Sequence, residues 1–506
     1  MFICGNFDAI MTDHRRLDLM HDLILPTLFF AALGGMTWAV RGCSGFGGVA
    51  GCIFAGVTWG AGWWYLAHDP AAEQSRRYAS GWIVPALTFG IGLAGARGWM
   101  QWPSFFEGRL MTNAARGEFV PIPRGYGFLW LFLAGVPWAG LGACALAWCG
   151  SRRRTRLWHW AFRVAFGLGG AALARHLFDA HPHFFLPLYD SLESRYRDLR
   201  HNPSLRRLIN DCGSAMLHLG VYLGFLLYEV VRRDWKNVVL ILTVGLFNGV
   251  GWAACQNWKW AAGLWPGSDF NFWRCWESSG GISIGLAYGI AYFLVNRRMS
   301  GSERAAIASR KTIEGPNLEW LIVYCGVACL LNWLLAGQLD GWGRIYLGVI
   351  LLFGVAYCLL YHGIETPAEG DANLQRWGLY VGLLAGLGLS VRNGLKGWFN
   401  IYKGNERYWD RVLWHWAGPV LLVLLIGIAA WVLLRPRPRN SRTSAFPHAY
   451  WIMWMVLIVQ NAIAQLITGP PTRWNEMAFS IYYLLLFAIT AVIVVHFQFV
   501  KMRGER

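Results

Sequence analysis

The chain has 506 residues, of which 56% are hydrophobic and 14% are charged, and its formal net charge is +17. An average water-soluble domain has about 25% charged residues, so this composition excludes an ordinary soluble globular protein. The basic residues occur in short runs between apolar stretches and not on one continuous face, which argues against nucleic acid as a partner. The sequence therefore predicts an integral membrane protein whose first partner is the lipid bilayer.

Apolar windows recur along the whole chain, and each approaches the roughly 20 residues of helix needed to cross about 30 Å of hydrocarbon. The predicted spans are 18–40, 44–67, 79–98, 126–149, 156–176, 209–231, 237–257, 277–296, 317–337, 342–361, 376–394, 409–434, 448–468 and 477–499. Residues 1–506 thus form a single transmembrane domain. The fold class is an all-α polytopic membrane protein with about 14 transmembrane helices.

The loops between these spans alternate in character. Short basic runs stand at Arg152 to Arg154, Arg232 to Arg233, Arg297 to Arg298 and Arg435 to Arg439. By the positive-inside rule these loops and both termini are cytoplasmic, which predicts a multi-pass protein of the cell (inner or plasma) membrane. The longer, aromatic-rich segments 98–125, 176–208 and 258–276 then face outward.

A repeat appears at the outward ends of the odd-numbered spans. An arginine follows glycine and other small residues in several of them, at Arg41, Arg97, Arg175 and Arg392, and Gln256 holds a comparable place in another. Several even-numbered spans open with an acid, at Asp211, Glu277, Asp410 and Glu476. This pattern favours seven helical hairpins of like orientation. A closed α/α ring and an open array are both compatible with such a repeat.

Aromatic and amide residues flank these helix ends. The candidate ligand-binding residues beside the arginines and Gln256 are Trp99, Trp102, Asn257, Trp258, Trp276, Asn393, Trp398 and Trp409. Aromatic faces stack on sugar rings, amides bond hydroxyls, and arginine forks bind phosphate, sulfate or carboxylate. An interfacial aromatic belt is the structural alternative, but most loop tryptophans lie on the predicted outer side, which favours a ligand site.

Three functions are compatible with these residues. The first is an outward-facing site that binds a glycan or anionic glycolipid and, as an enzyme, cleaves or transfers a glycoside with Glu277, Asp410 and Glu476 as catalytic carboxylates. The second is a transporter or flippase for an anionic or sugar-bearing solute. Glu229 lies inside a predicted span but close to its cytoplasmic end, which weakens the case for ion coupling. The third is a non-catalytic scaffold, in which the arginines and acids only cap helices. The motifs indicate neither a cofactor nor a metal.

Overall fold

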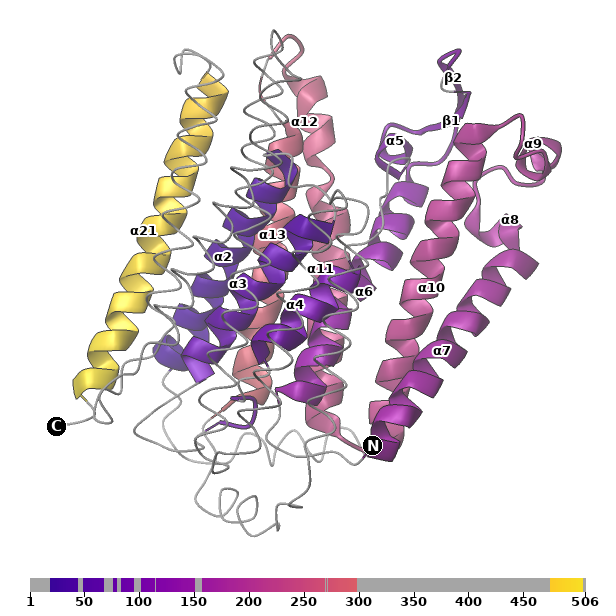
Figure 1. Ribbon diagram of the computed structural model, residues 1–506. Coiled ribbons are helices and arrows are strands. Elements are labelled where there is room, and N and C mark those ends of the chain that lie inside the picture. Colours follow the sequence, from indigo (N-terminus) through magenta and orange to yellow (C-terminus); the bar gives the residue numbers. More distant parts are fainter. Residues whose placement is uncertain are drawn as a thin grey trace, which may run out of the picture.

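The computed structural model describes residues 19–43, 49–67, 76–79, 83–94, 102–113, 115–150, 157–268, 270, 272–297 and 474–503, and most of them are helical (Figure 1). The predicted spans 317–337, 342–361, 376–394, 409–434 and 448–468 lie outside the described residues. The count of fourteen spans and the closure of the hairpins into a ring therefore stay predictions.

The described chain runs through helices with one small sheet. A π-helical turn η1 (Met20–Ile24) continues into α2 (Leu25–Cys43), and then come α3 (Val49–Ala67), α4 (Ile83–Ala94) and α5 (Trp102–Phe106). Strands β1 (Arg109–Asn113) and β2 (Glu118–Pro121) pair antiparallel. The remaining elements are α6 (Gly125–Cys149), α7 (Leu157–Ala180), α8 (Pro182–Phe185), α9 (Glu193–Arg197), α10 (Pro203–Val231), α11 (Trp235–Cys255), α12 (Trp258–Leu264), α13 (Phe272–Val295) and α21 (Trp474–Arg503).

Five helices in the described part are long and apolar enough to cross a membrane. They are Met20–Trp38, Gly125–Cys149, Pro203–Val231, Trp235–Cys255 and Arg274–Val295. Large apolar side chains on the outer helices are exposed, among them Leu168 and Leu173 of α7, Leu223 and Leu227 of α10, and Leu484 and Val492 of α21. Water would penalise such a surface, whereas lipid would not. The structure thus fits an all-α membrane protein.

Glycines determine how closely the central helices pack. Gly281, Gly285 and Gly289 follow one another at four-residue intervals on α13 and face α2. A Cβ atom at Gly285 would collide with the backbone carbonyl of Phe30, and one at Gly281 with that of Gly34. Without side chains at these positions the two backbones come into direct contact, which is a common way for membrane helices to associate.

The bundle has two chemically different ends. The "basic end" holds Arg77, Arg232, Arg233 and Arg297, together with the last turn of α6 and the first turns of α7 and α11. The "sheet end" holds β1, β2 and α12, at the top of Figure 1. The basic end is the one predicted to be cytoplasmic. At that end Tyr65 of α3 donates from Oη to the carbonyl of Val494 in α21, at 2.9 Å, so that segments distant in sequence meet there.

Candidate functional site

Five buried tryptophans from five helices meet inside the bundle. We call Trp38 of α2, Trp59 of α3, Trp138 of α6, Trp252 of α11 and Trp276 of α13 the tryptophan cluster. Trp38 stacks on Trp59 with ring centroids 5.6 Å apart, and Trp138 and Trp276 lie 4.9 and 5.0 Å from Trp252. Trp252 is in the last turn of α11 and Trp276 in the first turns of α13, so the cluster lies toward the sheet end.

Gln256 is the most unusual polar residue beside this cluster. It caps the C-terminus of α11 one turn after Trp252, and its exposed fraction is 0%. Within the described structure neither the nitrogen nor the oxygen of its amide has a hydrogen-bond partner. Buried polar groups are paired in the great majority of cases, and an unpaired one costs about 1 to 3 kcal/mol. Within the part of the chain that the structure describes, the amide of Gln256 therefore has one donor group and one acceptor group available for a hydrogen bond.

Glu277 lies at the start of the neighbouring helix. It follows Trp276 in α13 and is only 3% exposed. The ends of α11 and α13 are in direct contact, because a Cβ atom at Gly280 would collide with the ring of Trp252. The structure thus brings Gln256, Trp276 and Glu277, three of the residues singled out from sequence, to adjoining turns of two packed helices.

The start of α21 reaches the same region. Phe479 of α21 stacks on Phe270 with ring centroids 5.8 Å apart, and the guanidinium of Arg274 lies 4.6 Å from the centre of the Phe479 ring. Glu476 is one turn before Phe479, so the backbone at this candidate residue is close to the first turn of α13. The side chain of Glu476, like that of Arg41 in the last turn of α2, is not described.

Other candidates lie apart from the cluster. Arg175 is on α7, which packs against α10 and α8, and its Nε donates to Oδ2 of Asp179 at 2.8 Å on the helix surface. Trp102 of α5 stacks on Trp130 with centroids 5.7 Å apart. Asn257 and Trp258 are exposed at the start of α12. The candidates outside the described residues are Arg97, Trp99, Arg392, Asn393, Trp398, Trp409 and Asp410.

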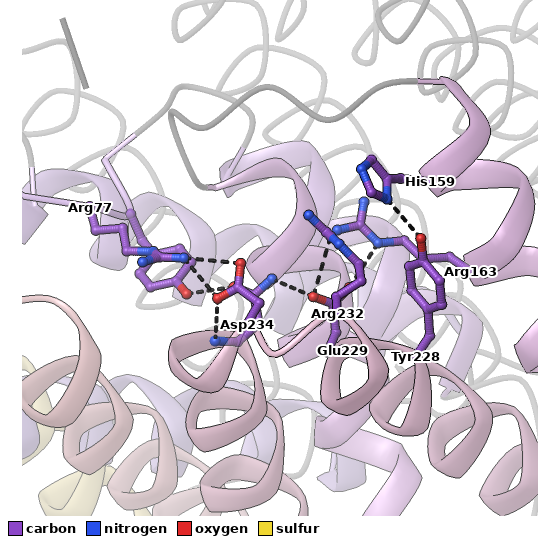
Figure 2. A network of polar contacts seen from close by, with 9 residues as sticks. Arg77, His159, Arg163, Tyr228, Glu229, Arg232 and Asp234 are labelled. Carbon is purple, nitrogen blue, oxygen red and sulfur yellow. Dashed lines mark hydrogen bonds and ion pairs between the residues drawn. The ribbon is translucent and has the colours of Figure 1, made fainter. Parts of the chain in front are cut away.

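A second polar assembly, at the basic end, is fully buried at its centre (Figure 2). Arg163 of α7 donates from Nε to Oε1 of Glu229 of α10 at 2.9 Å, and these side chains are 1% and 0% exposed. The other carboxylate oxygen of Glu229 accepts from Nδ2 of Asn237 of α11 at 2.8 Å and lies 3.5 Å from Nη1 of Arg232. The pair is thus supported by hydrogen bonds, as a buried ion pair requires.

The short segment 76–79 extends this assembly toward α13. Arg77 donates to both carboxylate oxygens of Asp234, at 2.8 and 3.1 Å, and the hydroxyl of Tyr78 donates to Oδ1 of Asn237 at 2.6 Å. The backbone of Tyr78 exchanges two hydrogen bonds with the side-chain amide of Asn296. Burial raises the pKa of Tyr78 well above its ordinary value, so its hydroxyl stays protonated and can donate.

Sequence reasoning did not identify most of this "basic-end network". The sequence drew attention to two of its members, Glu229 as evidence against ion coupling and Arg232 as part of a basic run that indicates topology, but to no contact between them. Arg163 was an available signal, because an arginine within an apolar helix is costly unless a partner neutralises it. Asp234 was another, since it stands where a helix N-cap belongs, and it does accept from the backbone N–H of Asn237.

Comparisons of the chain with protein-family models, with curated proteins and with solved structures find no match.

Proposed function

We propose that this chain is a multi-pass protein of the cell membrane that binds a sugar-bearing ligand, a glycan or the headgroup of a glycolipid, at the sheet end of its bundle. The observation that carries the proposal is Gln256, whose buried amide, beside the tryptophan cluster, has no hydrogen-bond partner among the described residues. A sugar hydroxyl can donate to the amide oxygen and accept from the amide nitrogen. Such pairing would offset the cost of burying the amide without hydrogen bonds.

The neighbours of Gln256 suit the same ligand class. The carboxylate of Glu277 can accept a hydrogen bond from a sugar hydroxyl, and aromatic side chains such as Trp276 provide faces that stack on sugar C–H surfaces. The guanidinium of Arg274, at the start of α13, would attract an anionic group on a glycolipid. Arg41 is in the last turn of α2, and we propose it as a second cation for the same group. The ligand would therefore meet amide, carboxylate, aromatic and guanidinium groups within one region.

The proposal has an enzymatic form. Glu277 would act with a second carboxylate, Glu476 or Asp410, in cleavage or transfer of a glycosidic bond. One carboxyl group would protonate the leaving oxygen while the other serves as nucleophile or activates water. The closeness of the first turns of α13 and α21 supports Glu476 as the partner of Glu277.

The proposed architecture follows the sequence repeat. Seven like-oriented hairpins would give fourteen spans, with both termini and the basic end in the cytoplasm and the sheet end outside. The described helices support this orientation in one respect, because Arg77, Arg232, Arg233 and Arg297 are all at the same end of the bundle.

Transport is the alternative that a specific observation favours. The basic-end network joins α7, α10, α11 and segment 76–79 into one closed assembly, which would be the cytoplasmic closure of an outward-open transporter or flippase. The surface ion pair of Arg175 with Asp179 is what the scaffold alternative expects, since it needs no ligand.

Binding to the chain in lipid nanodiscs tests the proposal. A panel of neutral and anionic glycans and glycolipids would be titrated while intrinsic tryptophan fluorescence is followed. We expect at least one ligand to bind, and Gln256→Met and Glu277→Gln to weaken its binding at least tenfold. Arg116→Gln, on the exposed turn between β1 and β2, is the control. Equal affinities of all four proteins would refute the proposed site, and ligand uptake by proteoliposomes without release of sugar would identify the transporter.

A further inference from the structure

Positive charge exceeds negative charge in the described basic-end network. Arg163 and Arg232 share the single carboxylate of Glu229, whereas Arg77 and Asp234 neutralise each other. Nε of Arg163 lies 2.9 Å from Oε1 of Glu229, whereas Nη1 of Arg232 lies 3.5 Å from Oε2 (Figure 2). The side chain of Arg232 is 12% exposed. Arg232 thus sits at the rim of the network with its charge only partly compensated and one edge open to the surroundings.

The residues next to Arg232 add to this charge. Arg233 is exposed, and its φ of 57° lies in the left-handed region, which turns the chain sharply between α10 and α11. Lys236 follows on the exposed first turn of α11. The loop therefore presents three cations within five residues, and the acid among those residues, Asp234, is buried and faces Arg77.

Two tryptophans flank this basic loop. Trp158 in the first turn of α7 is 49% exposed and Trp235 in the first turn of α11 is 55% exposed. Farther along the helices from this loop, the surface carries large apolar side chains, with Phe162 on α7 and Leu227 on α10 both exposed. The surface thus carries cations first, then tryptophans, then apolar side chains. This order matches the phosphate, the interfacial region and the acyl chains of a phospholipid.

We propose that this surface, formed by Trp158, Arg232, Arg233, Trp235 and Lys236, binds the headgroup of an anionic phospholipid. The phosphate would lie against Arg232 and Arg233, and the acyl chains would run along α7 and α10. Arginine forks suit phosphate oxygens, and the exposed apolar surface beside them favours a ligand with hydrocarbon chains over a free anion. This site is at the opposite end of the bundle from Gln256 and does not depend on the proposed sugar site.

The test uses the full chain in a neutral detergent. Its thermal unfolding is followed by tryptophan fluorescence while phosphatidylglycerol is titrated in. Phosphatidylcholine with the same acyl chains and inorganic phosphate are titrated in parallel. We expect phosphatidylglycerol alone to raise the unfolding temperature in a saturable way. An equal effect of phosphatidylcholine, or of inorganic phosphate, would overturn the proposal, because the first has no net charge and the second has no acyl chains.

Variants locate the effect. We expect Arg233→Gln and Arg232→Gln each to weaken the apparent affinity for phosphatidylglycerol about fivefold, the usual contribution of one basic residue at an anionic membrane surface. Arg206→Gln, at the exposed sheet end of the same helix α10, should leave it unchanged. Because Arg232 also contacts Glu229, Arg232→Gln could fail to fold. In that case Arg233→Gln alone tests the site. Full affinity in Arg233→Gln would refute the site.

Discussion

Replacing Gln256 by Met should make the ligand-free protein more stable and at the same time remove ligand binding. Met has a similar length and no hydrogen-bonding demand, so it fills the same volume beside Trp252. The amide of Gln256 is completely buried, and in the described part of the chain neither its nitrogen nor its oxygen has a hydrogen-bond partner. Removing one unsatisfied buried group recovers about 1 to 3 kcal/mol, and we expect a gain in the free energy of unfolding within that range.

The magnitude can be calibrated against a paired amide of the same helix. Asn237, near the other end of α11, donates to Glu229 at 2.8 Å and accepts from Tyr78 at 2.6 Å. Asn237→Leu keeps the shape but removes the acceptor of the buried Tyr78 hydroxyl and the shorter of the two contacts to Oε2 of Glu229. We therefore expect a loss of at least about 2 kcal/mol, opposite in sign to the effect at Gln256.

Unfolding of the detergent-solubilised protein by SDS, with the fraction folded followed by tryptophan fluorescence, measures both changes on one scale. In a second titration with a bound glycan or glycolipid, the wild type should be more stable than Gln256→Met, because only the wild type gains stability from the ligand. If Gln256→Met destabilises the ligand-free protein by more than about 1 kcal/mol, the amide has a structural partner. The reasoning from its unpaired state would then be refuted.

Three further outcomes follow from the described contacts. Glu229→Ala should destabilise the protein by about 3 to 5 kcal/mol in the same SDS assay, because it removes the carboxylate that neutralises the buried guanidinium of Arg163. The double variant Arg163→Met, Glu229→Leu should recover most of that loss, and equal losses in both would contradict a buried pair. Gly285→Leu should disrupt the packing of α13 on α2 and lower the yield of folded protein in size-exclusion chromatography, while Gly169→Ala, whose Cβ would meet nothing within 4 Å, should be tolerated; the reverse result would exclude the close helix contact. Burial raises the pKa of Tyr78 above its ordinary value of 10.0. The protonated hydroxyl therefore contributes fully to stability below pH 10.0, and this contribution is lost as the pH rises further. Tyr78→Phe should flatten the decline of the unfolding temperature above about pH 10, and an unchanged slope would argue against a buried hydroxyl.

The apolar windows predicted where many helices would form because hydrophobic length is a local property. The ranges 126–149 and 237–257, for example, coincide closely with α6 and α11. Sequence also drew attention to Gln256, Trp276 and Glu277, which the fold places on adjoining turns. Their burial and the missing partners of the Gln256 amide could not be predicted, since both depend on which helices surround them.

The basic-end network escaped prediction for a related reason. Tyr78, Arg163 and Asn237 are far apart in sequence, and nothing local indicates that Arg163 and Asn237 both bond Glu229 or that Tyr78 bonds Asn237. The place of Trp102 likewise depends on packing. It is predicted as a ligand residue because it follows a helix end, and in the fold its ring stacks on that of Trp130. Residue type and position suggested chemistry, but only the packing decides which groups share a site.

The density around Gln256 tests the central claim most directly. A cryo-electron microscopy map of the chain, extracted into nanodiscs with its native lipids and with the glycolipid that binds it added, should be determined at a resolution that shows side-chain amides. We predict non-protein density with hydroxyl-bearing atoms about 3 Å from both the nitrogen and the oxygen of the Gln256 amide. An amide bonded instead to another part of the chain, with the glycolipid bound elsewhere, would contradict the account.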